Sequence, residues 1–424
     1  MAHIVFIVNS YHPKFEGVGV CARNVVNELK IKNKVTVICK KTEFNQENSE
    51  EFEETQILRI ETNLDNFRNY VIAKSQESYA VRKFILTLIG FLLRVYRYLT
   101  VIFSKVILER DDVVAYFNSL GKIHAEDKID IVIPCSSRFE SCIAAAKFTL
   151  INEEVKLVPY MFDNYATNIS LYRNCRLFYN LKLDNHIALE RFVIQESDKI
   201  LCMKHYAESF IKIHKNIEKL IIVEHPLLVE LDNGNDFNFD KEKINIVYTG
   251  TLYRKIRNPK YALSVLSNVI ERNSEIILHI FDLGDCASMI KKFVKRHPNQ
   301  IIYHGYVSNI IAESARNSAD YLLSIGNISN NQLPGKTFEY MSALKPIIHF
   351  AKFKDDKTCR ILSSYPNTCI LIEDLDLMAC NAARINHFFE EIKERISFEA
   401  LKQIFPDAQP SYTAEKIEKY ILNT

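Results

Sequence analysis

The chain has 424 residues, more than a single hydrophobic core usually serves, so two domains are expected. A formal net charge of +2 is too small to indicate a nucleic-acid surface, and 48% hydrophobic with 25% charged residues is ordinary for a soluble globular protein. The ten cysteines form no C-x-x-C pair, which favours reduced, buried thiols in a cytosolic protein over disulfides or a metal site.

The N-terminal half predicts the alternation of strands and helices that is typical of a parallel α/β sheet. The first strand, at 2–10, has too short an apolar run for a signal peptide. A loop with Gly17 and Gly19, a helix at 21–30 and a strand at 34–40 complete a βαβ unit with glycine in its first turn. The further strands and helices of this half are expected at 129–137, 140–150, 155–164, 188–212 and 219–228.

The C-terminal half repeats this alternation after a polar, turn-rich segment at 230–243, which is the best linker candidate. Its expected elements, strands and helices in turn, lie at 244–252, 258–273, 275–285, 288–297, 300–307, 312–319, 320–326, 335–344, 345–350 and 368–374. We therefore expect an α/β fold with two doubly wound, Rossmann-like parallel-sheet domains facing a cleft. The expected domains are 1–228 and 244–400, followed by a helical segment at 401–424.

Residues 81–110 interrupt the alternation with a long apolar helix. Arg94 and Arg97 lie in its middle, where each would cost about 2.5–3.5 kcal/mol at the centre of a bilayer. At about 100° per residue, one narrow stripe contains Lys83, Thr87, Gly90, Arg94, Arg97 and Lys105. This pattern indicates either a cationic amphipathic helix at an anionic membrane interface or a helix packed on its own sheet with a solvated basic edge.

The stretch GNISNNQLPGKTFEYMSALKPIIHF, at 326–350, combines features that suit a phosphate with one acid that does not. Pro334 stiffens the approach to a helix start, Gly335 allows close contact, and Lys336 adds positive charge. Glu339 lies about one turn into the helix, where a carboxylate can accept two hydroxyl protons from a ribose. Phosphate and ribose together indicate a nucleotide. A P-loop is disfavoured, because the position of its other glycine holds Asn330.

Two further segments of this half carry candidate ligand groups. At 247–263 a strand ends at Gly250 and a loop follows with the cations Arg254, Lys255 and Arg257, which suit a diphosphate or form a solvated basic turn. At 302–307, Gly305 with Tyr306 and Val307 offers backbone groups and a flat apolar wall to a base.

The order of these motifs resembles that of glycosyltransferases of the GT-B fold, of the retaining family 4 type. The resemblance rests on YTGTL through NP, YHGYV, SADYLLSIGN and QLPGKTFEYMSALKPII, and more loosely on YHPKFEGVGV and LERFVIQESDKILCM. It spans nearly the whole chain. It implies an acceptor-binding domain at 1–228, a nucleotide-sugar-binding domain at 244–400, and a terminal helix that crosses back onto the first domain.

The resemblance also implies roles for individual residues. Glu339 would bind the donor ribose, and Gly305, Tyr306 and Val307 would flank the base. The diphosphate would be held by backbone and side chains of Gly250, Arg254, Arg257, Leu333, Pro334, Gly335, Lys336 and Thr337. Gly17 and Gly19 would line the cleft, with His12 a weaker candidate in the same loop. No cofactor or metal is expected, because cations neutralise the leaving diphosphate.

The implied partners are a nucleotide sugar of UDP or GDP type and a saccharide or lipid-linked saccharide acceptor, in surface polysaccharide biosynthesis. Nucleic acid is not expected as a partner. The expected location is cytoplasmic, with peripheral contact at the cytoplasmic face of a membrane through 81–110.

Two positions depart from the family pattern. Asn331 stands where a second glutamate is frequent, and Asp163 stands where many members have histidine. Asp163 is the candidate catalytic residue, binding a sugar hydroxyl or acting as base, unless it only caps the following turn.

These departures leave open a non-catalytic GT-B-like subunit that binds nucleotide sugars or acts as a scaffold. The sequence disfavours a third alternative, a dinucleotide oxidoreductase, because no third glycine follows Gly17 and Gly19 in the required G-x-G-x-x-G spacing.

Overall fold

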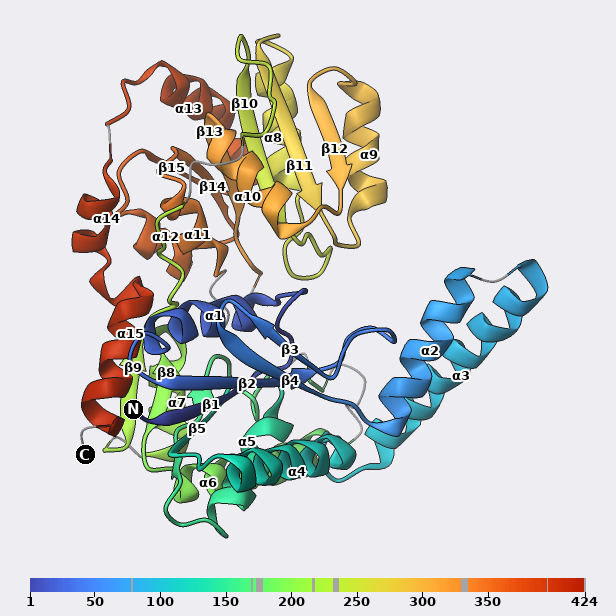
Figure 1. Cartoon of the computed structure of the whole chain (residues 1–424). Coiled ribbons are helices and arrows are strands. Elements are labelled where there is room, and N and C mark those ends of the chain that lie inside the picture. Colours follow the sequence, from blue (N-terminus) through green and yellow to red (C-terminus); the bar gives the residue numbers. More distant parts are fainter. Residues whose placement is uncertain are drawn as a thin grey trace. The chain divides into compact units, whose positions relative to one another are not determined.

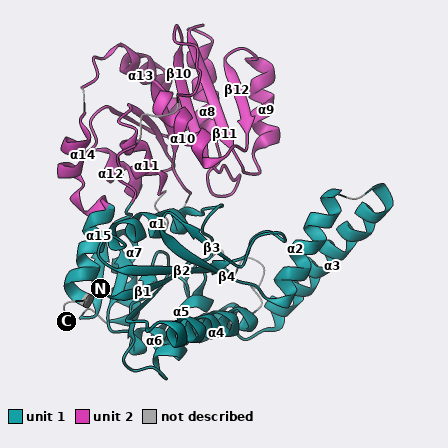
Figure 2. Cartoon of the chain, in the orientation of Figure 1, with its two compact units in different colours: residues 1–226, 410–424 teal, residues 227–409 magenta. Residues whose placement is uncertain are grey.

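The structure is a computed structural model of the chain and describes residues 1–77, 79–168, 171–172, 178–215, 218–231, 236–328, 335–394 and 396–422. Their contacts divide them into two compact units, shown in Figure 2. Unit 1 contains residues 1–226 and 410–424, and unit 2 contains residues 227–409. The predicted fold class is confirmed: both units are α/β with a parallel, Rossmann-like sheet, in a GT-B-like architecture.

Unit 1 is built on a six-stranded sheet in the order β3-β4-β2-β1-β5-β6 (Figure 1). Its strands, in that order, are Ser49–Phe52, Thr55–Ile60, Lys34–Lys40, His3–Ile7, Ile131–Pro134 and Lys156–Leu157. All neighbours are parallel except the β3–β4 hairpin. A second, parallel sheet contains β7 (Tyr160–Met161), β8 (Ile200–Met203) and β9 (Leu220–Val223).

The helices of unit 1 cover these sheets, except for one pair that projects from them. They are α1 (Gly17–Leu29), α2 (Asn63–Glu77), α3 (Ala80–Phe103), α4 (Arg110–Glu126), α5 (Phe139–Thr149), α6 (Tyr179–Glu196), α7 (Lys204–His214) and α15 (Pro410–Ile417), which continues as η4 (Glu418–Leu422). Helix α3 packs against α2, so the prediction that it packs on its own sheet is wrong. The two helices extend away from the rest of unit 1 as a hairpin (Figure 1).

Unit 2 has one six-stranded, fully parallel sheet in the order β12-β11-β10-β13-β14-β15. Its strands, in that order, are Ile301–Gly305, Ile276–Asp282, Ile244–Gly250, Tyr321–Ile325, Ile347–Ala351 and Thr368–Ile372. The helices are α8 (Lys260–Ile270), α9 (Ala287–Arg296), α10 (Asn309–Ser318), α11 (Lys336–Ser342), α12 (Lys357–Leu362), α13 (Met378–Glu390) and α14 (Phe398–Ile404), with the 3-10 turns η2 (Leu375–Leu377) and η3 (Pro406–Ala408).

The strand order of unit 2 reverses between β10 and β13. Numbered within the unit, the order is 3-2-1-4-5-6. After β10 the chain continues toward one edge of the sheet, and after β13 it continues toward the other edge. Doubly wound sheets bind ligands at such a switch point, beyond the carboxyl ends of the two strands. In this sheet those ends are Gly250 and Ile325.

The C-terminal boundary falls at 409–410, whereas the sequence placed it at 400–401. Phe405, just after α14, meets the ring of Phe338 at a centroid distance of 6.0 Å, so this segment packs within unit 2. Helix α15 packs against α1 in unit 1. The nine cysteines among the described residues are free thiols, and most are buried.

Gly19 gives a first prediction, because a side chain there has no space. A Cβ on Gly19 would lie 2.4 Å from the carbonyl oxygen of Ser10, whereas a Cβ on the exposed Gly17 would meet nothing within 4 Å. Gly19→Ala should therefore destabilise the protein by about 1–3 kcal/mol in urea unfolding. The matched control Gly17→Ala should be neutral or slightly stabilising, since alanine is the better helix former. Equal unfolding midpoints for the two variants would contradict this close approach.

His186 gives a second prediction, on pH. Its Nε2 accepts the backbone N–H of Ile107 at 2.8 Å, so its proton sits on Nδ1, 2.5 Å from the hydroxyl of Tyr172. Burial, with Lys182 nearby, lowers the pKa of His186 from 6.5 to about 4. The folded state holds the neutral ring. The contribution of His186 to the free energy of unfolding, on the order of 3 kcal/mol, is therefore fully present above pH 6.5 and is lost as the pH falls toward 4. His186→Gln, which accepts the same N–H without titrating, should flatten this part of the curve in urea unfolding at pH 7 and 5. An unchanged pH dependence would refute the assignment.

Candidate functional site

The strongest candidate site lies at the switch point of unit 2, where Gly250 ends β10. Gly250 has a φ of 149°, a conformation that favours glycine. A Cβ there would lie 3.2 Å from Cδ of Lys336 and from the hydroxyl of Tyr248. The bare backbone of Gly250 therefore lets the Lys336 side chain lie across the end of the central strand.

Glu339 and two cations form the charged centre of this site. Oε2 of Glu339 lies 3.4 Å from Nζ of Lys336 and 3.6 Å from a guanidinium nitrogen of Arg316. No hydrogen bond or ion pair to the other oxygen, Oε1, occurs within the described part of the chain. Both cations thus occupy one carboxylate oxygen and leave the second for another donor.

The electrostatics hold Glu339 ionised. Burial acts to raise the pKa of Glu339, but Lys336 and Arg316 outweigh it and hold this pKa below its ordinary value. Burial lowers the pKa of Lys336, and Arg316 and Arg257 act in the same direction, while Glu339 opposes them. One carboxylate therefore shares the site with several cations, and the local charge is positive.

The sequence alone did not single out Arg316. This residue lies in the last turn of α10, with its side chain 8% exposed, and its guanidinium donates to Oγ1 of Thr249 at 3.3 Å. A buried arginine needs an anionic partner, and Glu339 is that partner. The available signal was one arginine in the small-residue run AESARNSA, directly before a buried strand.

Tyr340 fixes α11 to the end of β10. Its hydroxyl accepts the backbone N–H of Thr249 and donates to the carbonyl oxygen of the same residue, both at 2.9 Å. Burial raises the pKa of Tyr340, so the phenol keeps the proton that it donates. The paired bonds hold Glu339, one residue away, in a fixed position relative to the strand.

The two predicted arginines of the loop after β10 take different directions. Arg257 donates from Nε to Oδ1 of Asn327 at 3.1 Å, which ties it to the residue after Gly326 at the end of β13. Arg254 is exposed and donates to Oγ of Ser288 in α9 at 2.6 Å. With Lys260, Lys292 and Arg296 it lines a shallow cavity of about 320 Å³. The structure thus brings Arg257, and not Arg254, to the switch point.

The residues predicted to flank a base lie at the end of β12. Gly305 has a φ of 70°, which explains the glycine, and Tyr306 is 63% exposed. Val307 is half-buried. β12 is the edge strand of the sheet, next to β11, so this segment is separated from the switch point by one strand.

The segment before α11 contains several predicted ligands. Asn331, Leu333 and Pro334 lie outside the described residues. Helix α11 has seven residues, fewer than the predicted 335–344, so its dipole is short and the positive charge comes mainly from side chains. Thr337 is 3% exposed, and its hydroxyl has no hydrogen-bond partner within the described ranges, so its predicted contact with a diphosphate stays a prediction.

Asp163 belongs to a cluster at the carboxyl ends of β7, β8 and β9 in unit 1. Its Oδ1 lies 3.7 Å from Nε2 of His205, the second residue of α7. The ring of His205 stacks on that of His225 at 5.2 Å, and His225 pairs with Glu224 at 2.8 Å. Burial acts to raise the pKa of Glu224, but the hydrogen bond with His225 outweighs it, and the pKa falls below its ordinary value.

This cluster joins an exposed acid to buried histidines. Asp163 is 47% exposed, whereas the side chain of His205 is 4% exposed. The two histidines were not predicted, because 62 residues separate Asp163 from His225 and only the parallel sheet brings them together.

The first loop of unit 1 provides less evidence for a ligand site. His12 pairs through Nδ1 with Oε1 of Glu50 at 2.8 Å and stacks on Phe52 at 3.9 Å, so β3 accounts for it. Gly19 is explained by its contact with Ser10. The cleft roles of Gly17 and Gly19 stay predictions.

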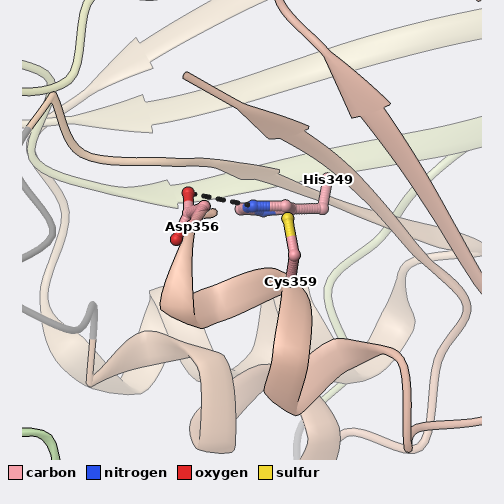
Figure 3. A group of neighbouring side chains, drawn as sticks. All are labelled: His349, Asp356 and Cys359. Atoms are coloured by element: carbon pink, nitrogen blue, oxygen red, sulfur yellow. Dashed lines mark ion pairs between the residues drawn. The ribbon is translucent and has the colours of Figure 1, made fainter. Parts of the chain in front are cut away.

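His349, Asp356 and Cys359 form a group that could hold a metal ion, with ligand atoms within 4.8 Å of one another (Figure 3). Nε2 of His349 lies 3.7 Å from Oδ2 of Asp356, and Asp356 caps α12 through the N–H of Thr358 at 2.8 Å. Burial raises the pKa of Cys359 to about 12, so an ion would have to displace the thiol proton. We assign this group a structural role: it ties β14 to α12, and a Cβ on Gly326 would lie 2.5 Å from Asp356.

The chain was also compared with known proteins. No family model and no curated protein matches the sequence. Among solved structures it is similar to sucrose-phosphate synthase from Thermosynechococcus elongatus, with a TM-score of 0.64, 10% identity, and coverage of 100% of this chain and 99% of the other. It is also similar to a structure of trehalose-6-phosphate from E. coli bound with UDP-2-fluoro glucose, with a TM-score of 0.61, 9% identity, and coverage of 98% and 97%.

A third similar structure is the apo form of the lipopolysaccharide outer core galactosyltransferase WaaB, with a TM-score of 0.55, 13% identity, and coverage of 99% of both chains. At these identities the likeness shows the fold alone. The chain thus has a GT-B-like fold.

Proposed function

We propose that this chain is a retaining glycosyltransferase that transfers a sugar from a nucleotide diphosphate sugar, of UDP or GDP type, to a saccharide or lipid-linked saccharide. The observation that carries the proposal is the arrangement of Lys336, Arg316 and Glu339 at the switch point of unit 2. The similar E. coli structure contains a UDP sugar analogue, which supports a donor of this class.

The cations of the site would receive the diphosphate. Lys336 is 36% exposed, so its ammonium can reach a ligand while it stays near Glu339. Arg257, which is half-buried and bonded to Asn327, adds a second cation. The buried Arg316, next to Glu339, adds a third positive charge. In this proposal side chains neutralise the leaving diphosphate, and no metal ion is required.

Glu339 would take the ribose. Its Oε1 can accept hydrogen bonds from the two ribose hydroxyls while Oε2 keeps the two cations. A carboxylate beside a phosphate site would normally repel the ligand, but here two cations compensate its charge. The carboxylate therefore selects a nucleotide over a simple polyphosphate.

In the proposed reaction the bond between the anomeric carbon and the diphosphate oxygen breaks, and a bond to an acceptor hydroxyl oxygen forms on the same face of the sugar. The proton of that hydroxyl passes to a base or to the departing diphosphate. Asp163 is the proposed base or hydroxyl-binding group, and His205 is proposed to position it. We propose surface polysaccharide biosynthesis in the cytoplasm as the setting, in line with the galactosyltransferase among the similar structures.

The first test compares a nucleotide with a ligand that lacks the ribose. Glu339→Ala should weaken UDP or GDP about 10- to 100-fold in titration calorimetry, because two hydrogen bonds to a charged group are lost. The same variant should bind pyrophosphate equally well or better, because an acid has left a cationic site. Lys336→Ala should weaken both ligands.

Glu399→Ala is the matched control, because its side chain is 75% exposed on α14 of the same unit, and neither affinity should change. Loss of nucleotide and pyrophosphate binding in equal measure in Glu339→Ala would count against a ribose contact.

The second test addresses Asp163. Asp163→Asn should lower the rate of nucleoside diphosphate release from the nucleotide sugar by about 10²- to 10⁴-fold, with nucleotide affinity unchanged. Glu208→Gln, an exposed acid on α7, is the control and should keep the wild-type rate. A rate that survives in the Asn variant would remove Asp163 from the chemistry. A wild-type protein that binds the nucleotide sugar and releases nothing, with any acceptor tried, would favour the binding or scaffold subunit instead.

A further inference from the structure

The α2–α3 hairpin, residues 63–103, extends away from the rest of unit 1 (Figure 1). Helix α3 has 24 residues and is long and apolar enough to cross a membrane by length and composition. Its packing partner is α2, the shorter and more polar helix of the pair. Most of its surface therefore faces outward.

The base of the hairpin is firmly attached. Lys182 of α6 donates to the carbonyl oxygen of Val101 at 3.0 Å and also contacts that of Ser104. Asn185 of the same helix donates to the carbonyl oxygen of Lys105 at 3.0 Å, and His186 accepts from Ile107. The end of α3 thus has a fixed direction relative to unit 1.

The two faces of α3 differ sharply. The inner face packs on α2 through Leu86, which is 9% exposed, and through Gly90, whose Cβ position lies 3.8 Å from Val71. At about 100° per residue, the outer face is a broad stripe with no polar side chain other than tyrosine. Its exposed members are Val81, Phe84, Ile85, Leu88, Phe91, Leu92, Val95, Tyr96, Tyr98, Leu99 and Phe103.

The charges of α3 have one sign. Residues 80–103 contain Arg82, Lys83, Arg94 and Arg97 and no acid. Lys83 and Arg94 border the apolar stripe along one margin, and both are exposed. Arg97 turns toward the base, where it pairs with Glu109 at 2.9 Å. An apolar stripe with a cationic margin complements the surface of an anionic lipid bilayer.

We propose that the α2–α3 hairpin docks unit 1 on an anionic membrane surface, with α3 lying in the interface and its outer face among the acyl chains. This inference stands on the hairpin alone and does not need the proposed function.

Two other roles for the outer face of α3 fit the structure less well. A membrane span would carry Arg94 to the middle of the bilayer and would take the polar helix α2 with it. A coiled coil with a second copy would use a narrow seam of aliphatic residues, whereas this stripe is broad and rich in Phe and Tyr.

The absence of tryptophan from the chain gives a clean reporter. Phe91→Trp places a single indole on the outer face, at a position that is 55% exposed. With vesicles of phosphatidylglycerol in phosphatidylcholine, its emission should shift to the blue and be quenched by brominated lipid chains. Ile151→Trp, at a position that is 71% exposed just after α5, is the matched control and should respond to neither.

Flotation of the full chain tests the two components of the surface separately. Phe91→Glu with Val95→Glu places acids on exposed positions, so the double variant should stay folded, which circular dichroism checks. Its binding to vesicles should fall about tenfold or more, because apolar surface is lost. Lys83→Gln with Arg94→Gln should reduce the preference for anionic over phosphatidylcholine vesicles.

Three results would overturn the proposal. The Phe91→Trp emission could remain that of a solvated indole with anionic vesicles. The wild-type chain could stay in the soluble fraction. A blue shift without lipid that rises with protein concentration, together with a dimer in sedimentation, would assign the outer face to a second copy instead.

Discussion

The ion pairs among Glu339, Lys336 and Arg316 are the interaction on which the candidate site depends. Arg316 has an 8% exposed side chain, and a buried cation of this kind must have a counter-charge. Glu339 supplies it and keeps its own charge, because the two cations lower its pKa against the effect of burial. The acid that looks misplaced beside a phosphate site is therefore needed to stabilise the site before any ligand arrives.

The topology of the unit 2 sheet brings these groups together from segments that are far apart in the sequence. Gly250 ends the first strand of unit 2, Arg316 precedes the fourth, and Lys336 and Glu339 follow it, so all four lie around one switch point. Tyr340 fastens α11 to Thr249 by two bonds of 2.9 Å. Charge, backbone space and position thus agree on the same switch point, which is where doubly wound sheets bind ligands.

Much of the fold was predictable because parallel strands are buried on both faces and read as apolar runs, as in residues 244–250. Gly250, Lys336 and Glu339 could be proposed from the sequence because glycine and charge are informative next to such runs, and the structure places them together at the end of β10. Arg316 and Tyr340 were missed, since each acts on Thr249 across 67 and 91 residues of sequence. In the same way, the stripe of cations on α3 was visible in the sequence. Only the structure, in which α3 packs on α2, shows that the apolar face of α3 is exposed.

The central claim is that Glu339 accepts the ribose hydroxyls of a nucleotide while cations hold its diphosphate. A double-mutant cycle measures this most directly, with wild type and Glu339→Ala each titrated with the nucleoside diphosphate that binds and with its 2′,3′-dideoxy counterpart. The account predicts a coupling free energy of about 1.5 kcal/mol or more between carboxylate and hydroxyls. A coupling near zero, with the dideoxy compound weakened equally in both proteins, would contradict it.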